Sequence, residues 1–464
     1  MTNLSQQHPH SAAVVGIQLG DEGKGRVVDN KIKEFVQEKG LKKVYVIRSQ
    51  GGSNAGHTVE KGDARIGLHQ LPSGIFHEQV IEVLDSGMVI HVEDLLTEIE
   101  LVEDLVGDIS SRVILSQDAM LCTDLQRAKE ALNKIISGRA KGGTGRGMGP
   151  TCAEFYDKTG LKVKDLVSEN WQVKFEAKYD QFDRLFSAFD QKLAEMKVPD
   201  FRTTKKKGEA AARTVGSRKV FIDRLAEQRK KLIAKQLVQD TFFLHPKLYE
   251  DKESAVVFEM AQGVGLDPWF GTRPDRTSTP TTPYGILSGT RYWKPEMIGA
   301  VFGVMKATYM SSVGARTMPT EAADNWAEWV RETAHEYGTT TGRPRDICYL
   351  DLEFLKYNLH VADLTGIVLT HLDIARKGES IKVCTGYQLD GEDVSYKPDM
   401  NLFDQYQPQY QQLPGWDIAD VAGVTDYDQL PKNTQNFIKF LEEKTGLPVA
   451  AATTGPERKD IIWL

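Results

Sequence analysis

A glycine-rich turn near the start of the chain carries both a cation and carboxylates. The segment GDEGKG (20–25) follows a short apolar run and precedes a segment with helical spacing, so backbone N–H groups and a helix N-terminus would meet an anion together. The Lys24 ammonium could reach a terminal phosphate, but the turn is not a Walker A loop, because a glycine follows Lys24 where Ser or Thr would stand. Asp21 and Glu22 would repel a phosphate unless one of them holds a metal ion or acts as a base.

Three other glycine-bearing segments carry side chains that suit anions. The segment GGSNAGHT (51–58) follows a predicted strand and places His57 at a strand end, where α/β enzymes bind substrates. A single histidine is more often structural, but a second glycine loop that points to the same sheet edge favours a role in a site. Hydroxyls and guanidiniums in GGTGRGMGP (142–150) and YGTTTGRPRD (337–346) suit phosphates and carboxylates. The pattern predicts two or three anionic ligands.

An aspartate that could recognise a purine base ends another apolar run. Asp373 closes the segment THLD (370–373), which directly follows Ile, Val and Leu. Its two carboxylate oxygens can accept from two adjacent N–H groups, which is the pattern that one edge of guanine presents. By itself this feature is only weakly specific for guanine.

The segments between these loops predict an α/β fold with a mostly parallel central sheet and flanking helices. Short, β-branched apolar runs predict buried strands, and they alternate with segments of helical spacing. Parallel strands place their carboxyl ends, and the loops that follow them, along one edge of a sheet. The predicted buried strands are 12–18, 42–52, 254–263, 297–307, 366–373 and 380–388.

Residues 164–253 differ from the rest and predict a helical subregion. Apolar side chains recur at steps of three and four from Phe175 to Leu193, which describes one face of an amphipathic helix. A second helix is predicted over 220–240. The intervening segment 203–219 is basic and rich in small residues, and we interpret it as a solvent-exposed loop rather than a phosphate-binding patch, because runs of like charge usually stay solvated.

Composition restricts the class of protein. The 464 residues include 58 Lys plus Arg and 65 Asp plus Glu, a net charge of −7, which argues against a protein that coats nucleic acid. The four cysteines form no CxxC pair and predict reduced core thiols rather than a zinc site. The polar N-terminal segment and the lack of any apolar run near 18 residues predict a cytoplasmic protein without membrane association.

Together, the ordered motifs resemble those of the adenylosuccinate synthetase family, of which this chain would be a divergent member. The matching segments run from residue 13 to residue 373, and TTGPERKDIIWL closes the chain. The resemblance implies one adenylosuccinate-synthetase-like domain over 1–464, with a fold like that of P-loop NTPases but without a standard Walker A loop. The motifs are VVGIQLGDEGKGRVVD, GGSNAGHTV, LHQLPSGIF, GTGRGMGP, GLKVKDL, FEMAQGVGLD, RTSTPTTPYG, GVMKATYMSSVGARTMPTE, YGTTTGRPRD and LTHLD.

The resemblance also implies roles for individual residues. Asp21 would be the general base, His57 the general acid, and Lys24 and Gln262 would complete the catalytic set, while Asp21 and the Gly56 carbonyl would bind Mg²⁺. The purine nucleotide would contact Asn54, Ala55, Gly56, His57, Thr144, Lys158, Gln262, Thr277 and Arg343. L-Aspartate would contact Thr339, Thr340, Thr341, Gly342, Arg343 and Arg345. The phosphate donor would contact Gly20, Asp21, Glu22, Gly23, Lys24, Gly25, Arg26, Arg345, His371, Leu372, Asp373, Thr453, Thr454 and Gly455.

The implied reaction joins L-aspartate to IMP, with hydrolysis of GTP to GDP and phosphate through a 6-phosphoryl-IMP intermediate, in AMP biosynthesis. Lys158 matches an arginine that serves the neighbouring subunit's site, so the resemblance implies a homodimer. Because Lys158 and His371 depart from the family pattern, a related synthetase that acts on dGMP or GMP, with GTP or ATP, is an alternative. A GTP-binding paralogue without activity is a second alternative, which the presence of Asp21, Lys24 and His57 disfavours.

Overall fold

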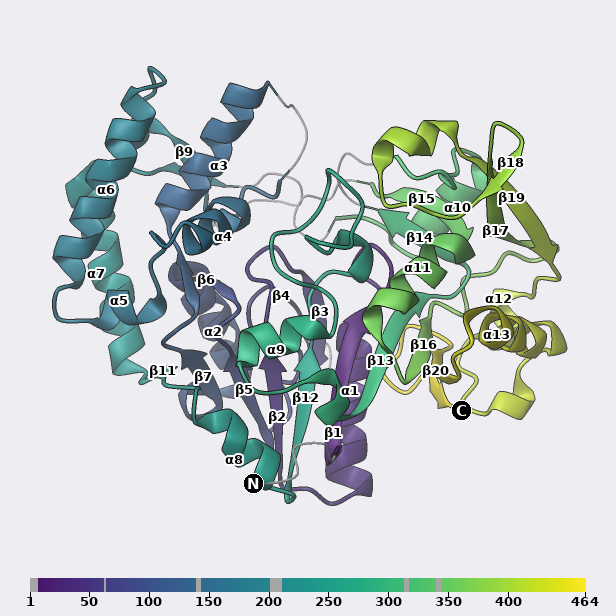
Figure 1. Cartoon of the computed structure of the whole chain (residues 1–464). Coiled ribbons are helices and arrows are strands. Elements are labelled where there is room, and N and C mark those ends of the chain that lie inside the picture. The colour runs from purple at the N-terminus through teal and green to yellow at the C-terminus, as the bar shows by residue number, and fades with distance from the viewer. Residues whose placement is uncertain (1–6, 62–63, 139–142, 201–210, 313–316, 339–343) are drawn as a thin grey trace.

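The computed structural model contains a ten-stranded sheet. Figure 1 shows that this sheet runs through the centre of the protein. The structure describes residues 7–464 except 62–63, 139–142, 201–210, 313–316 and 339–343. Every neighbouring pair in this sheet is parallel except β20 with β21. In spatial order the strands are β11 (Val238–Gln239), β7 (Val113–Ser116), β5 (Val80–Leu84), β2 (Lys43–Arg48), β12 (Ser254–Glu259), β1 (His8–Gly16), β13 (Ile298–Lys306), β16 (Gly366–Thr370), β20 (Val449–Thr453) and β21 (Ile461–Trp463).

The central strands are buried on both faces, which explains why they appear in the sequence as continuous apolar runs. In β1, Ala13 and Val15 belong to the hydrophobic core on one face of the sheet, whereas Ala12 and Val14 belong to the core on the other. Alternate side chains of a strand point to opposite faces, so a strand covered on both sides needs apolar residues throughout. The predicted α/β fold with a mostly parallel sheet is confirmed.

The predicted strand at 380–388 is not part of the central sheet. It forms β17 (Ile381–Leu389), which pairs in parallel with β15 (Asp346–Asp351) and antiparallel with β18 (Glu392–Val394) and β19 (Gln407–Leu413). The strand β14 (Tyr309–Ser312) completes this second, five-stranded sheet, which lies at the upper right of Figure 1. Burial alternates along parts of β17, as expected for a strand with only one covered face.

Helices flank both sheets, and the described residues also form three separate two-stranded sheets. None of the described helices is long and apolar enough to cross a membrane. The four cysteines are buried free thiols that form no disulfide, as predicted. The helices are α1 (Lys24–Lys33), α2 (Val92–Val106), α3 (Asp124–Ser137), α4 (Met148–Tyr156), α5 (Val163–Val167), α6 (Trp171–Ser187), α7 (Arg218–Ala234), α8 (Leu244–Glu250), α9 (Tyr284–Thr290), α10 (Asn325–Thr333), α11 (Leu352–Ala362), α12 (Ile418–Val421) and α13 (Lys432–Thr445). The two-stranded sheets are β3 (His57–Lys61) with β4 (Ala64–Leu68), β6 (Val89–His91) with β8 (Met120–Cys122), and β9 (Lys197–Pro199) with β10 (Ala212–Thr214).

The helical subregion at the left of Figure 1 contains shorter helices than predicted. Helix α6 ends at Ser187 rather than near Leu193, because Asp190 adopts φ 54° and the backbone N–H of Gln191 returns to the carbonyl of Phe186 at 3.0 Å. Leu193 is nevertheless buried with the helices, in a short turn that follows the reversal. The apolar spacing therefore identified the buried face correctly and misplaced the end of the helix.

Part of the segment interpreted as a solvent-exposed basic loop is instead ordered and partly buried. Residues 201–210 lie outside the described residues, but Ala212–Thr214 forms β10 and pairs with β9. The Arg213 guanidinium contacts Glu93 and lies 3.0 Å from Asp124, and its side chain is 11% exposed. The interpretation as a loop is wrong for this stretch, because a charged residue with two carboxylate partners can be buried.

We predict that Arg213→Ala destabilises the protein by about 3 kcal/mol, since truncating one member of a buried ion pair removes an attraction that offsets the cost of burying its carboxylate partners. Arg218→Ala is the matched control, because Arg218 binds Asp180 on the surface, 2.9 Å away, with both side chains about half exposed. Such a surface pair contributes less than about 1 kcal/mol. Urea unfolding of both variants measures the difference, and equal losses would contradict the structural role of Arg213.

Candidate active site at the carboxyl edge of the sheet

The loops that the sequence singles out follow parallel strands and meet at one edge of the central sheet. The order β2, β12, β1, β13, β16, β20 is continuous, and each of these strands ends at the same edge because all run parallel. This edge is where open α/β sheets bind their ligands. The loops are 17–23 after β1, 49–56 after β2, 260–263 after β12, 371–373 after β16 and 454–455 after β20.

The first loop folds around the carboxylate of Glu22, which is fully buried. Its Oε1 accepts hydrogen bonds from the backbone N–H groups of Gln18 at 3.2 Å and Gly20 at 2.7 Å. The Lys24 ammonium donates to Glu22 Oε2 at 2.6 Å and to the carbonyl oxygen of Gln262 at 2.6 Å. The Glu22 side chain therefore holds the first loop and the loop after β12 together from inside.

The start of α1 lies against the loop that contains His57. The helix begins at Lys24, directly after Gly23, which has φ 87°. A Cβ atom at Gly25 would lie 2.9 Å from Ser73 Oγ and 3.9 Å from the Cβ of His57, so a glycine there allows the two segments to approach. The N-terminus of α1, which favours an anion, and the imidazole thus belong to one site.

Several polar atoms at this edge are buried without a partner among the described residues. They are Oδ1 of Asn54, Nε2 of His57 and both amide atoms of Gln262. A Cβ placed on Gly51 would lie 3.7 Å from Gln262 Oε1, so the amide borders the loop after β2. Because buried polar atoms are nearly always paired in native proteins, these atoms indicate groups that a polar ligand would satisfy.

His57 is neutral at neutral pH in this structure. Burial lowers the pKa of His57 to about 4, and the neighbouring Glu259 carboxylate only partly opposes this effect. The Nδ1 atom of His57 lies 3.8 Å from Glu259 Oε1, which is too long for a hydrogen bond. Glu259 is itself fixed by the backbone N–H of Ser73 at 2.7 Å and by the Ser73 hydroxyl at 2.8 Å. An anion bound beside His57 would raise its pKa again.

Asp21 is paired with Arg345, which directly precedes β15 of the second sheet. It has φ 58°, and its carboxylate, 40% exposed, contacts the guanidinium of Arg345. The other end of that guanidinium donates to Glu336 at 2.5 Å. Arg345 thus bridges two carboxylates, one at the mouth of the site and one in the interior.

Hydrogen bonds also join the loops that surround Asp373. The backbone N–H of Leu372 donates to the Thr453 carbonyl at 3.1 Å, which connects the ends of β16 and β20. Arg26 at the start of α1 donates to the Gly455 carbonyl at 3.0 Å. Burial raises the pKa of Asp373, and the nearby Arg26 guanidinium only partly opposes this effect.

Carboxylates from α2 and α3 hold the loop that carries Thr144. Glu130 accepts from the backbone N–H of Gly145 at 2.8 Å and from that of Gly147 at 2.7 Å. The guanidinium of Arg146 lies 3.3 Å from the carboxylate of Asp94. The two carboxylates therefore fix the residues that follow Thr144, while Thr144 itself is exposed.

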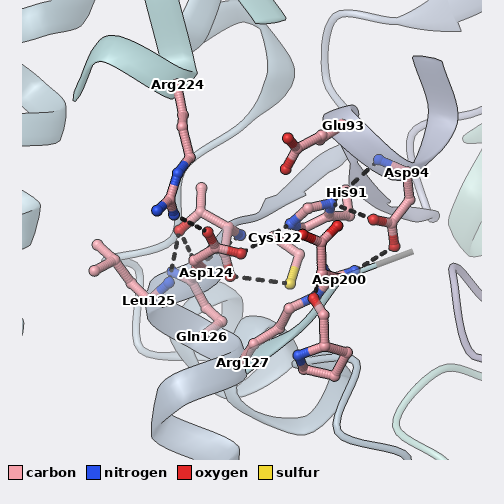
Figure 2. Close-up of polar contacts among 12 residues, drawn as sticks. His91, Glu93, Asp94, Cys122, Asp124, Leu125, Gln126, Arg127, Asp200 and Arg224 are labelled. Atoms are coloured by element: carbon pink, nitrogen blue, oxygen red, sulfur yellow. Dashed lines mark hydrogen bonds and ion pairs between the residues drawn. The ribbon is translucent and has the colours of Figure 1, made fainter. Parts of the chain in front are cut away.

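Figure 2 shows that Asp94 belongs to a larger cluster of buried charges. The His91 imidazole lies between two carboxylates, with Nδ1 3.1 Å from Asp94 Oδ1 and Nε2 3.6 Å from Asp124 Oδ1. Asp124 also binds Arg224 of α7 at 3.0 Å and Arg213 of β10. This cluster connects the helical subregion to the loop that carries Thr144.

The structure does not bring every predicted site residue to the sheet edge. Lys158 follows α4, has φ 60° and is exposed on the surface. Thr277 lies in the loop between β12 and α9, where its backbone N–H donates to the Leu266 carbonyl at 2.8 Å. The predicted aspartate loop, Thr339 to Arg343, lies outside the described residues.

Several residues that support the site were missed by sequence reasoning. Glu336 stands three residues before Thr339 of a glycine-bearing motif, and Glu259 stands inside the motif FEMAQGVGLD. Their closeness to these motifs could have identified both as candidate site residues. Asp94 and Glu130 lie on helices without any motif. Their partners are 52 and 15 residues away in the chain, so no local pattern identifies them.

The buried histidine His371 gives a pH-dependent contribution to stability. Burial lowers the pKa of His371 to about 4 from an ordinary value of 6.5, so as the pH falls below 6.5 the unfolded chain takes up this proton and the folded chain does not. The contribution is present above pH 6.5 and lost between pH 6.5 and pH 4, with a limit of about 3 kcal/mol. The charged or titratable groups around the ring are Lys306, Tyr309, Glu336, Asp21 and Arg26.

We predict that the unfolding free energies of the parent and His371→Gln converge as the pH is lowered from 7 to 4.5. His360→Gln is the control, because His360 lies on the exposed side of α11. Urea unfolding at four pH values measures the difference. A difference between parent and His371→Gln that stays constant with pH would contradict the prediction.

Comparison with known proteins gives one consistent family. The family model for adenylosuccinate synthetase matches residues 13–462. The adenylosuccinate synthetase of Trichlorobacter lovleyi is 33% identical over 458 residues, covering 98% of each chain. That of Thermobifida fusca is 34% identical over 457 residues, covering 97% of this chain and 98% of the relative.

Two solved structures are also similar. A fully ligated adenylosuccinate synthetase from Plasmodium falciparum matches with a TM-score of 0.84 and 29% identity, covering 98% of this chain and 100% of the other. A succinoaminodeoxyadenylate synthetase of cyanophage S-2L, bound to dGMP and dATP, matches with a TM-score of 0.54 and 16% identity over 98% of this chain and 96% of the other, which shows a shared fold alone. The family model, the relatives at one-third identity and the site at the sheet edge agree, and the chain belongs to the adenylosuccinate synthetase family.

Proposed function

We propose that this protein is a ligase that joins L-aspartate to IMP to form adenylosuccinate, with hydrolysis of GTP to GDP and phosphate, in AMP biosynthesis. The observation that carries the proposal is the meeting of the motif loops at one sheet edge, where Asn54, His57 and Gln262 offer buried polar atoms without partners. Membership of the adenylosuccinate synthetase family supports the same reaction. The 6-oxygen of a purine is a poor leaving group, so the reaction would proceed through 6-phosphoryl-IMP.

The side chains at the edge suit that sequence of steps. Asp21 would take the N1 proton of IMP, which makes the 6-oxygen nucleophilic toward the γ-phosphoryl group of GTP. His57 would donate a hydrogen bond or a proton at the 6-oxygen, and the Lys24 ammonium would neutralise charge on the transferring phosphoryl. In the structure Arg345 contacts Asp21, so the base becomes available only when Arg345 moves to another anion, which L-aspartate would supply.

Magnesium would be held by the Asp21 carboxylate and the Gly56 carbonyl. The described residues contain no group of three or more His, Cys, Asp or Glu side chains that could hold a metal ion. This fits Mg²⁺, which takes one or two protein carboxylates and completes its shell with phosphate oxygens and water. When bound, the ion would supply positive charge to the phosphates of the donor.

We propose GTP as the phosphate donor because Asp373 offers two acceptor oxygens. These match the N1–H and the amino group of guanine, whereas N1 of adenine is itself an acceptor and would face the carboxylate with repulsion. The loop 453–455 would close the pocket around the base. His371, Leu372, Thr453, Thr454, Gly455 and the residues from Gly20 to Arg26 would complete the donor site, and Arg343 with Thr339–Gly342 and Arg345 would bind L-aspartate.

A substrate screen tests the proposal. The purified protein with Mg²⁺ and L-aspartate should release phosphate with IMP and GTP, and mass spectrometry should find adenylosuccinate. Turnover of dGMP or GMP but not IMP, or equal efficiency with ATP and GTP, would replace the proposal with the related purine specificity. The absence of turnover with every pair would indicate a paralogue that binds GTP without catalysis.

We predict that Asp21→Asn and His57→Ala each lower kcat/KM by about 100-fold to 10,000-fold, since each removes a group that transfers a proton. The Asp21 and His57 side chains are 40% and 13% exposed and are not part of the hydrophobic core, so melting temperatures should change little. Asp108→Asn and His360→Ala are matched controls on the surface and should keep full activity. Near-normal activity in both site variants would refute the assigned roles.

We also propose a homodimer that forms through the face carrying α4. Phe155 and Tyr156 at the end of this helix are 47% and 67% exposed, and Lys158 follows them. An isologous two-fold contact would bury these rings and place each Lys158 ammonium near the partner's purine-nucleotide phosphate. Both active sites would then be shared.

Light scattering should therefore give twice the mass of one chain. Lys158→Ala should weaken binding of the purine nucleotide without changing that mass, because the residue would contact a phosphate of the other subunit's ligand. Lys192→Ala is the control, since Lys192 is 77% exposed and binds Glu195 on the surface, 3.0 Å away. A fully active monomer would contradict the dimer.

A further inference from the structure

One interior carboxylate collects four hydrogen-bond donors beside the proposed active site. Glu336 lies in the turn after α10 and is 1% exposed. Burial alone would raise the pKa of Glu336, but the neighbouring cations outweigh it and lower the pKa well below its usual range, so the group is ionised. The Oε1 atom accepts from Lys306 Nζ and from the Tyr309 hydroxyl, the latter at 2.6 Å. The Oε2 atom accepts from Arg345 Nη1 at 2.5 Å and from the Ser311 hydroxyl at 3.1 Å.

The Tyr309 hydroxyl connects this carboxylate to His371. Its oxygen lies 2.6 Å from Glu336 and 2.6 Å from Nδ1 of His371. A phenol has one proton, and an ionised carboxylate can only accept, so the proton of Tyr309 points to Glu336. Toward His371 the same oxygen must therefore accept, which requires that Nδ1 carries the hydrogen.

The ring of His371 is thereby fixed in one neutral tautomer. Burial lowers the pKa of His371 to about 4, so the second ring nitrogen, Nε2, is unprotonated at neutral pH and offers a lone pair. The backbone is fixed as well, because the N–H of His371 donates to the Thr453 hydroxyl at 3.1 Å. Two residues further along stands Asp373, another acceptor in the same loop.

We propose that Tyr309 is a positioning residue that holds His371 as its Nδ1–H tautomer, so that Nε2 accepts a hydrogen bond from an O–H or N–H group of the phosphate-donor nucleotide. The inference rests on the proposed function, which assigns the loop 371–373 to that nucleotide. It adds a specificity contact, because an unprotonated nitrogen selects a ligand that presents a donor. If the hydrogen were on Nε2 instead, this nitrogen would be a donor and would no longer select a ligand that presents a donor.

The tautomer is tested directly by NMR of protein labelled with ¹⁵N-histidine. The chain has 10 histidines, and His371→Gln identifies the signal of His371. In the parent, Nδ1 should show the shift of a protonated nitrogen and Nε2 that of a bare one. Tyr309→Phe removes only the hydroxyl and should convert the signal to a mixture of tautomers. A parent signal with the hydrogen on Nε2 would overturn the proposal.

Tyr349→Phe is the matched control for both tests. Tyr349 of β15 lies directly opposite Tyr309 of β14 in the same strand pair, but its hydroxyl contacts Asp324, away from the site. The control should retain the parent tautomer and the parent kinetics. A change equal to that of Tyr309→Phe would show that any hydroxyl lost from this strand pair disturbs His371, and would overturn the specific role.

Kinetics test the contact with the nucleotide. Tyr309→Phe should raise KM for GTP about 3-fold to 10-fold, the range expected for one hydrogen bond, and leave KM for IMP and L-aspartate unchanged. The rise in KM caused by Tyr309→Phe should disappear with a nucleotide that lacks the contacted group. If Nε2 contacts the ribose hydroxyl, that nucleotide is 2′-deoxy-GTP; if it contacts the amino group of the base, that nucleotide is ITP. An altered tautomer with an unchanged KM for GTP would overturn the proposal.

Calorimetric titration with GTP separates this inference from the proposed function. A parent protein that binds GTP but does not ligate IMP would refute the ligase and still test the contact, because Tyr309→Phe should weaken GTP binding by the same factor. Equal GTP affinity of parent and variant would overturn the inference alone. A parent that does not bind GTP would overturn both.

Discussion

The buried carboxylate of Glu22 is the contact on which the arrangement of the active-site edge depends. It folds the first loop by accepting from Gln18 and Gly20, and it holds Lys24 against the loop after β12. The surrounding backbone is glycine where the carboxylate needs space, since a Cβ at Gly16 would lie 2.3 Å from Glu22 Oε2. A charged group this deep is tolerated because each oxygen has a donor. The shape and charge of the edge are therefore set by a carboxylate that is bound from both sides by groups of the protein itself.

The same principle recurs at two other places, which lie on either side of the edge. Glu336 organises cations and hydroxyls behind the donor side, and Asp94 and Asp124 organise arginines behind the loop that carries Thr144. Buried ion pairs add little net stability compared with apolar packing, but they allow few alternative geometries. A protein that must place several anionic ligands within a few ångströms gains more from fixed geometry than from added stability.

The sequence predicted the fold class and the loops of the site because both depend on local patterns. Continuous apolar runs identified β1, β2, β12, β13 and β16, and glycine-bearing turns identified the loops that follow them. It failed where the outcome depends on distant contacts. The strand at 380–388 joins a second sheet, and Arg213 is buried because Glu93 and Asp124, about 90 to 120 residues away, neutralise it. Asp21 and Glu22 are adjacent carboxylates, but the Asp21 side chain is partly exposed and that of Glu22 is fully buried. The residue types alone do not show which of the two is buried.

The two outer strands of the central sheet are its shortest. One edge ends in β11, with two residues, and the other in β21, with three, which runs antiparallel to its neighbour. The chain terminus is fastened there, since the Lys31 ammonium lies 5.2 Å from the ring centre of Trp463. Long exposed edges invite pairing with strands of other molecules. With so little unpaired backbone on either side, a sheet of this width is protected from edge-to-edge aggregation, and an assembly of copies through this sheet would have to use side-chain surfaces instead.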